Sequence, residues 1–198
     1  MTTTGGARTC IDLFWIPLGA GGSGFVRLNG RIYEAVKARR EGRVPLAIYH
    51  TALQVHTPQG RHVVETMWPS PDGNTNARGV VLQGPVGIQL LGKWRSFRYE
   101  VRRWRDGVLP DADEAVGGPR RVSDNADDAR RLLELADSLP RLIWGRDQLG
   151  TGEMWNSNSV ISWLLASTGL FMETIRPPAG GRAPGWDAGV AIADRGAP

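Results

Sequence analysis

The stretch MWNSNSVISWLLASTGL, Met154–Leu170, decides how this chain is interpreted. It opens with a polar cluster of asparagine and serine and continues as an apolar run typical of a buried helix. Gly169 is a natural end for that helix, so the sequence predicts a helix over Ser157–Thr168. Ser157 then lies at the helix N-terminus. Unpaired backbone N–H groups and a partial positive charge there favour an activated nucleophile beside an oxyanion hole.

The same polar cluster also fits an ordinary capped helix. Asn156, Ser157, Asn158 and Ser159 are all residue types favoured at an N-cap. If the helix begins two residues later, Ser159 replaces Ser157 as the candidate nucleophile. Trp155, Asn156 and Asn158 flank the nucleophile and are candidates to line its pocket or to stabilise an oxyanion. The sequence leaves open whether Ser157 reacts or caps.

A histidine lies on the strand predicted over Pro45–Val55, where YHTALQV places His50 between apolar residues. The turn TPQG, Thr57–Gly60, predicts a β-hairpin with the next strand. An even-length turn puts His50 and Glu65 on one face as diagonal neighbours, which is how a general base is oriented by a carboxylate. An odd-length turn puts them on opposite faces. Gln54 shares the His50 face and is a further candidate oxyanion donor.

These segments resemble the permuted papain-like proteins, which include circularly permuted relatives of NlpC-type amidases, PPPDE isopeptidases and the lecithin:retinol acyltransferase group. IYHTALQV resembles their histidine strand, HVVET the strand with the third polar group, and WNSNSVISWLLASTGL the nucleophile helix. The resemblance implies a hydrolase or acyltransferase that acts on an amide, isopeptide or ester bond through Ser157, His50 and Glu65. It also implies an α+β fold with an antiparallel sheet packed against a few helices.

The chain departs from that family at the nucleophile, because Ser157 stands where the family has cysteine. A thiol is held as a thiolate at a helix N-terminus, whereas a serine hydroxyl must pass its proton to His50 as it attacks. The main alternative is therefore a catalytically inactive binding module. A second alternative is a nucleotide-binding protein. The loop GAGGSG, Gly19–Gly24, matches G-x-G-x-x-G, although His50 stands where the fingerprint expects an acid.

The rest of the chain predicts one domain of the α+β class. We expect a disordered tail over 1–9, a single permuted papain-like domain over 10–175, and a Pro/Gly-rich tail over 176–198 with one short turn near Trp186. Further strands are predicted over Ile11–Leu18, Arg61–Trp68, Gly79–Leu82 and Phe97–Trp104. Helices are predicted over Phe25–Arg40 and Ser123–Leu139, and a loop over Asp106–Val122.

The resemblance implies a small-molecule, lipid or peptide substrate, and composition argues against other partners. The formal charge is +4 and the arginines are spread out, so nucleic-acid binding is not predicted. Cys10 is the only cysteine, and none of the three histidines has paired-ligand spacing, so we expect no metal and no cofactor. His56 is expected to be solvated at the turn. Without a secretory signal or a membrane span, a cytoplasmic location is expected, and the oligomeric state is left open.

Overall fold

The computed structural model describes residues 8–20, 24–69 and 79–196. Its fold is α+β, as predicted, with a seven-stranded sheet and four α-helices within those residues. The strands are β1 (Cys10–Pro17), β2 (Ala47–Thr57), β3 (Gly60–Met67), β4 (Val80–Pro85), β5 (Arg98–Arg105), β6 (Arg120–Ser123) and β7 (Gly181–Arg182). The helices are α1 (Gly24–Arg40), α2 (Ala126–Leu135), α3 (Ser157–Thr168) and α4 (Trp186–Asp194).

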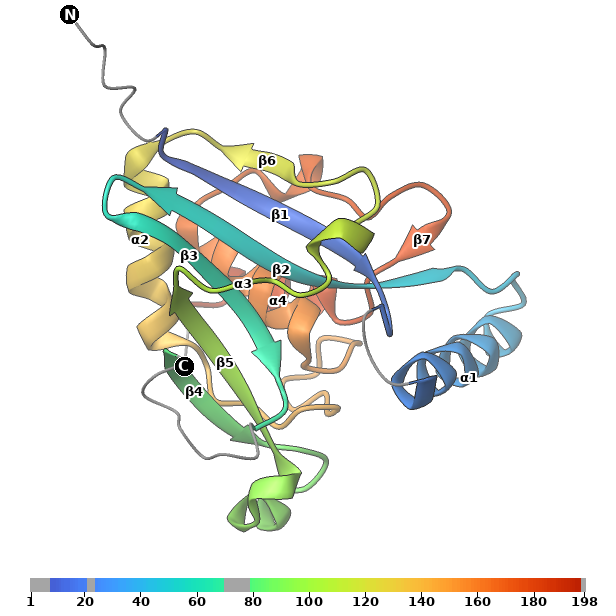
Figure 1. The fold of residues 1–198 in the computed structure, drawn as a ribbon. Coiled ribbons are helices and arrows are strands. Elements are labelled where there is room, and N and C mark those ends of the chain that lie inside the picture. The colour runs from blue at the N-terminus through green and yellow to red at the C-terminus, as the bar shows by residue number, and fades with distance from the viewer. Residues whose placement is uncertain (1–7, 21–23, 70–78, 197–198) are drawn as a thin grey trace, which may run out of the picture.

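The main sheet is antiparallel, in the order β4-β5-β3-β2-β1-β6, and the short β7 pairs in parallel with β2. The predicted hairpin register is confirmed, since Thr57 pairs with Gly60 and Leu53 with Val64. Helices α2, α3 and α4 lie behind one face of this sheet, while α1 projects to the side of the molecule (Figure 1). The hairpin strands therefore run across the middle of the sheet.

The core lies between the sheet and α3. Alternate residues of β1, such as Leu13 and Trp15, point to this side and are buried with Ile161 and Leu164 of α3. The sequence of α3 is apolar on almost every side, and a helix of that kind is stable only when it is covered all round. The sheet covers one side of α3 and α4 covers another. This burial fixes where the N-terminus of α3 meets the sheet.

The predicted C-terminal tail is wrong. Residues 176–198 contain β7 and α4, and Trp186 packs against Trp15 with ring centroids 4.8 Å apart. Gly189 lets α4 cross α3 closely, because a Cβ there would lie 2.1 Å from the Ser162 hydroxyl. The short turn expected near Trp186 is thus a helix of the core. The many glycines and prolines of this segment mark tight turns around α4.

Two further expectations need correction. The loop predicted over Asp106–Val122 contains the start of β6, which pairs with β1. The glycine loop after β1 leads into α1, but β1 and β2 are antiparallel, whereas a dinucleotide-binding unit needs parallel strands. Residues 1–7 and 21–23, which include parts of the predicted N-terminal tail and of the glycine loop, lie outside the described residues.

Candidate functional site

The N-terminus of α3 is capped by Asn156 rather than by a serine. The Asn156 side-chain oxygen accepts hydrogen bonds from the backbone N–H groups of Asn158 (2.9 Å) and Ser159 (3.3 Å). The Ser159 hydroxyl in turn accepts a hydrogen bond from the Asn156 backbone N–H (3.1 Å). This reciprocal pair is a capping box. Capping therefore makes no demand on Ser157.

Ser157 is the first residue of α3 and is half-buried. Its hydroxyl makes no hydrogen bond to any residue that the structure describes, and neither does its backbone N–H. The first N–H groups of a helix have no partner within the helix, and the helix dipole places partial positive charge beside them. Ser157 thus combines a free hydroxyl with a free backbone donor, which is what a nucleophile and one arm of an oxyanion hole require.

The neighbouring polar side chains are structural. Ser159 is fully buried and donates its hydroxyl proton to the Gly185 carbonyl (2.7 Å), so it is not an alternative nucleophile. The Asn158 amide donates to the Tyr49 carbonyl (3.0 Å) and the Pro184 carbonyl (2.9 Å), while its oxygen accepts from Thr51 (3.0 Å). Asn158 therefore ties α3 to β2 and has no free donor for an oxyanion, contrary to expectation.

Asn156 and Asn158 line the larger of the two cavities described below, as predicted for pocket residues, whereas Trp155 and Gln54 line neither cavity. Trp155 belongs to the core, where its indole N–H donates to the Tyr99 hydroxyl (3.2 Å). Asn156 lines the site, but its side-chain oxygen caps α3 and one of its two amide hydrogens is donated to the Pro184 carbonyl (2.8 Å). Gln54 lies four residues from His50 on β2, about 13 Å away along the strand, and lines neither cavity described below.

His50 and Ser157 face the same cleft. Two adjoining cavities, of about 590 Å³ and about 210 Å³, share part of their walls. We call the space between these shared residues the His50–Ser157 cleft. The residues that line both cavities are Leu18, His50, Trp68, Trp144 and Ser157. The predicted meeting of the histidine strand and the serine helix is therefore present, although no hydrogen bond joins the two side chains among the described residues.

The His50 imidazole is neutral at physiological pH. Burial lowers the pKa of His50 to about 4. The ring makes no hydrogen bond or ion pair with any described residue, so nothing in that part of the chain competes for its lone pair. A neutral imidazole that faces a cleft is able to accept a proton from a hydroxyl placed beside it.

Glu65 does not join His50. It is buried on β3 directly opposite Arg102 of β5, and no hydrogen bond or ion pair between it and His50 occurs within the described residues. Burial raises the pKa of Glu65 to about 7, with Arg102 acting in the opposite direction and Asp111 adding to the rise. The confirmed hairpin register leaves Glu65 diagonal to His50 on the β2 side, while Arg102 stands directly opposite Glu65 on the β5 side. No bond of the predicted constellation of Ser157, His50 and Glu65 is formed among the described residues, and only Ser157 and His50 line a common cavity.

Asp111 and two tryptophans complete the cleft, and none of the three was predicted as a site residue. Asp111 lines the smaller cavity together with His50 and Ser157. Burial raises the pKa of Asp111. Trp68 and Trp144 stand with ring centroids 6.3 Å apart and form much of the apolar wall. All three lie outside the named helices and strands, where no hydrophobic period indicates which way a side chain points.

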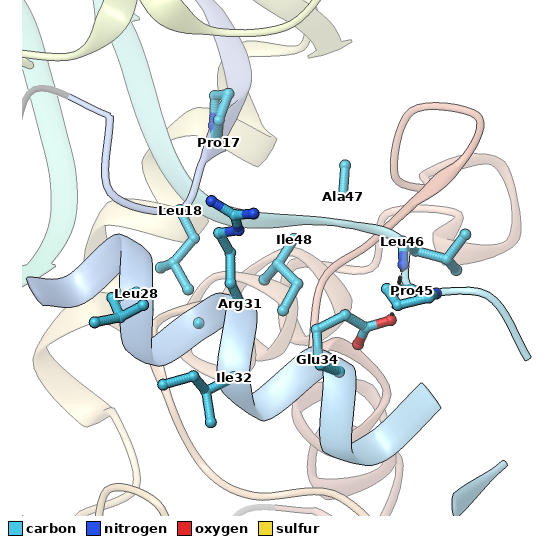
Figure 2. Close-up of a pocket in the computed structure, with 12 residues that line it drawn as sticks. Pro17, Leu18, Leu28, Arg31, Ile32, Glu34, Pro45, Leu46, Ala47 and Ile48 are labelled. Atoms are coloured by element: carbon cyan, nitrogen blue, oxygen red, sulfur yellow. Dashed lines mark hydrogen bonds between the residues drawn. The ribbon is translucent and has the colours of Figure 1, made fainter. Parts of the chain in front are cut away.

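An apolar groove adjoins the cleft. It lies between α1 and the start of β2, has a volume of about 660 Å³, and shares Leu18, Gly30 and Ile48 with the larger cavity of the cleft. Figure 2 shows Leu18 and Ile48 pointing toward α1, with Leu28 on the facing side. The site therefore continues beyond His50 and Ser157 along a mainly apolar path.

Comparison with known proteins adds no relative. No family model matches the chain. Searches among curated proteins and among solved structures likewise find no match. None of the helices in the described residues is long and apolar enough to cross a membrane. The function proposed below therefore rests on the geometry of the cleft.

Proposed function

We propose that this protein is a serine-type hydrolase or acyltransferase with a permuted papain-like fold, in which Ser157 is the nucleophile and His50 the general base. One observation carries the proposal: a hydroxyl and a neutral imidazole, both without partners among the described residues, line one cleft. The order of the chain also agrees, with the histidine on a strand and the serine later, at a helix start. A capping box that leaves Ser157 free supports the same assignment.

The chemistry follows from these positions. The Ser157 oxygen attacks the carbonyl carbon of an ester or amide while His50 takes the hydroxyl proton. The negative charge on the former carbonyl oxygen is stabilised by the Ser157 backbone N–H and the α3 dipole. The leaving alcohol or amine departs with the proton from His50, and the acyl group remains as an ester of Ser157. Water or an acceptor then attacks that ester with His50 as base, which releases the acyl product and restores the hydroxyl.

We propose Asp111, rather than Glu65, as the carboxylate that serves His50 when the imidazolium forms. Asp111 lines a wall of the cleft with His50, whereas Glu65 lies beside Arg102 and lines neither cavity. An imidazolium formed during the reaction is stabilised by a nearby carboxylate. We assign Asp111 as a positioning residue. Asp111→Asn is expected to lower kcat more than it raises KM, while Glu65→Gln leaves both constants unchanged.

The walls of the cleft favour an apolar acyl group. Tryptophan, leucine and isoleucine line it, and the groove beside α1 extends the apolar surface. Apolar contact is worth about 0.8 kcal/mol for each buried methylene. We therefore expect kcat/KM for p-nitrophenyl esters to increase with acyl chain length. Because His50 must be neutral to act as base, kcat/KM should rise through about pH 4 and then stay level toward neutral pH.

The test compares ester hydrolysis by the natural protein with that by Ser157→Ala, His50→Ala and Ser167→Ala. Ser167 is the matched control, since it is another partly buried serine near the far end of α3. We expect Ser157→Ala and His50→Ala each to reduce kcat by about a thousandfold or more, and Ser167→Ala to have no effect. Equal activity in the natural protein and Ser157→Ala would overturn the proposal.

The second candidate is a binding module without catalysis. Two observations favour it: a histidine with a pKa of about 4 is a weak base, and no carboxylate among the described residues is bonded to His50. The two candidates differ in a simple experiment. A binding module takes up an apolar acyl ligand, detected by quenching of the Trp68 and Trp144 fluorescence, without turning over any ester of that ligand. A hydrolase binds the ester and cleaves it.

A further inference from the structure

A second cluster of reactive side chains lies at the far end of β1 and β2. Cys10 pairs directly with His56 across the two strands, and Asp12 lies two residues along β1 on the same face. The Asp12 Oδ2 atom is 3.8 Å from the Cys10 Sγ and 3.7 Å from the His56 Nε2. One atom from each of the three residues lies within 4.8 Å of the others. Three different metal-ligating groups therefore converge.

The cluster is rigid and partly enclosed. Cys10 is 4% exposed and Asp12 7% exposed, and both lie inside a regular strand. The His56 side chain is 36% exposed and forms the open side. His56 is thus not simply solvated at the turn, and the spacing of cysteine and histidine along the sequence did not indicate this arrangement. The strand register, rather than a short motif, brings the three residues together.

We propose that Cys10, Asp12 and His56 form a binding site for a divalent transition metal, with Zn²⁺ as the best match. Thiolate, imidazole and carboxylate are the three ligand types that Zn²⁺ takes in proteins. Tetrahedral Zn²⁺ with ordinary bond lengths requires S···O and N···O separations of about 3.6 and 3.4 Å. The observed S···O and N···O separations of 3.8 and 3.7 Å are close to these values, and the third pair, thiol and imidazole, lies within 4.8 Å. The fourth position is left for water.

The surroundings of Asp12 support this assignment. The Arg121 Nε donates to Asp12 Oδ1 at 2.6 Å, and its Nη2 makes a longer contact of 3.5 Å with Oδ2, the oxygen nearest to Cys10 and His56. A hydrogen bond to one oxygen of a ligating carboxylate holds the other in place, as outer-shell groups do in known metal sites. Arg121 also bonds to Asp124, which offsets its positive charge. The thiolate and carboxylate together balance the two charges of the metal.

The proposed metal site is separate from the His50–Ser157 cleft. His56 lies six residues beyond His50 on β2, which corresponds to about 20 Å along the strand. The metal would therefore connect the start of β1 to the end of β2 rather than take part in the acyl chemistry. Its presence or absence is independent of the proposed hydrolase function.

The test uses Co²⁺ as a spectroscopic probe. Untagged, full-length protein is freed of metal with a chelator and titrated with Co²⁺, and then Zn²⁺ is added to displace it. We expect one equivalent of Co²⁺ to produce visible bands of a tetrahedral site and a near-ultraviolet thiolate-to-cobalt band. Zn²⁺ should remove both. Because Cys10→Ser removes the thiolate, it should abolish the near-ultraviolet band.

Two histidine variants complete the test and do not depend on a change to the buried cysteine. His56→Ala, at the exposed side of the cluster, should weaken Co²⁺ binding at least tenfold. The matched control is His62→Ala on the adjacent strand β3, which should bind as the natural protein does. Absence of the thiolate band in the natural protein would overturn the proposal. So would equal Co²⁺ affinity in His56→Ala and His62→Ala.

Discussion

At the scale of single residues, Asn156 decides what Ser157 is free to do. Its side chain caps α3, and its amide also donates to the Pro184 carbonyl. Asn156→Ala removes the cap and leaves buried backbone groups without partners, so we expect unfolding free energy to fall by about 2 kcal/mol. Asn125→Ala is the matched control, because Asn125 caps α2 at an exposed position. Urea denaturation should show the smaller loss, about 1 kcal/mol, for the control.

Glu65 makes the stability of the protein depend on pH. Its pKa is raised from an ordinary 4.5 to about 7 by burial, so the folded state holds a proton that the unfolded state loses. The contribution of this proton to the free energy of unfolding is complete below pH 4.5, where both states hold it. That contribution is lost as the pH rises through 7, where the folded state also loses the proton. Glu65→Gln keeps the shape without the charge and should be more stable than the natural protein at pH 8, by about 1–3 kcal/mol.

Urea denaturation at pH 5 and pH 8 checks this prediction. The gain from Glu65→Gln should appear at pH 8 and be small at pH 5. The exposed substitution Glu173→Gln serves as control and should change neither value by more than about 0.5 kcal/mol. A gain of the same size at both pH values would show that Glu65 does not hold this proton in the folded protein.

At the scale of elements, the contact between α3 and α4 depends on one glycine. A Cβ on Gly189 would lie 2.1 Å from the Ser162 Oγ and 2.2 Å from the Ser159 carbonyl oxygen. Backbone at that distance cannot move away without separating the helices. Gly189→Ala should therefore lower the free energy of unfolding by about 1–3 kcal/mol, despite the better helix propensity of alanine.

Thermal unfolding of Gly189→Ala beside Asp187→Ala tests that contact. Asp187 is exposed on the same helix, and its replacement should change stability by less than about 0.5 kcal/mol. An alanine at position 189 that stabilises the protein would mean that the two helices are not in close contact.

The sequence predicted elements well where the signal is local. The hairpin register follows from the turn at Thr57–Gly60. Helix α3 follows from its polar start, its apolar run and Gly169, whose φ of 95° lies in the left-handed region that favours glycine. The prediction from sequence was wrong at α4, because the glycines and prolines around that helix are also typical of an irregular C-terminal tail. Glu65 lies in the predicted register, but the hairpin does not reveal that Arg102, on a third strand, stands directly opposite it.

At the scale of the whole molecule, the C-terminal segment completes the fold. Carbonyl groups of Pro184 and Gly185 accept hydrogen bonds from side chains at the start of α3, and Trp186 is buried against Trp15. A chain that ends at residue 175 should therefore lose its cooperative thermal transition and its near-ultraviolet circular dichroism. The control ends at residue 196 and should unfold as the full chain does. A folded chain of 175 residues would contradict this account of the core.

The cleft is likewise a property of the whole molecule. Its walls come from the ends of β1 and β3, the start of β2, one side of α1, the segment before α3 and α3 itself. The family resemblance predicted His50 and Ser157 as site residues because both lie on regular elements, a strand and a helix. Trp68, Trp144 and Asp111 lie between elements, and only the packed structure shows that they meet the other two.

The most direct test of the central claim is covalent labelling by a fluorophosphonate, which reacts with an activated serine. We expect one fluorophosphonate adduct per chain, located on Ser157 by peptide mass spectrometry. Labelling should be absent in Ser157→Ala, strongly slowed in His50→Ala and unchanged in Ser167→Ala. An adduct on another residue, or labelling at the same rate in the natural protein and His50→Ala, would contradict the assignment of Ser157 as nucleophile and His50 as its base.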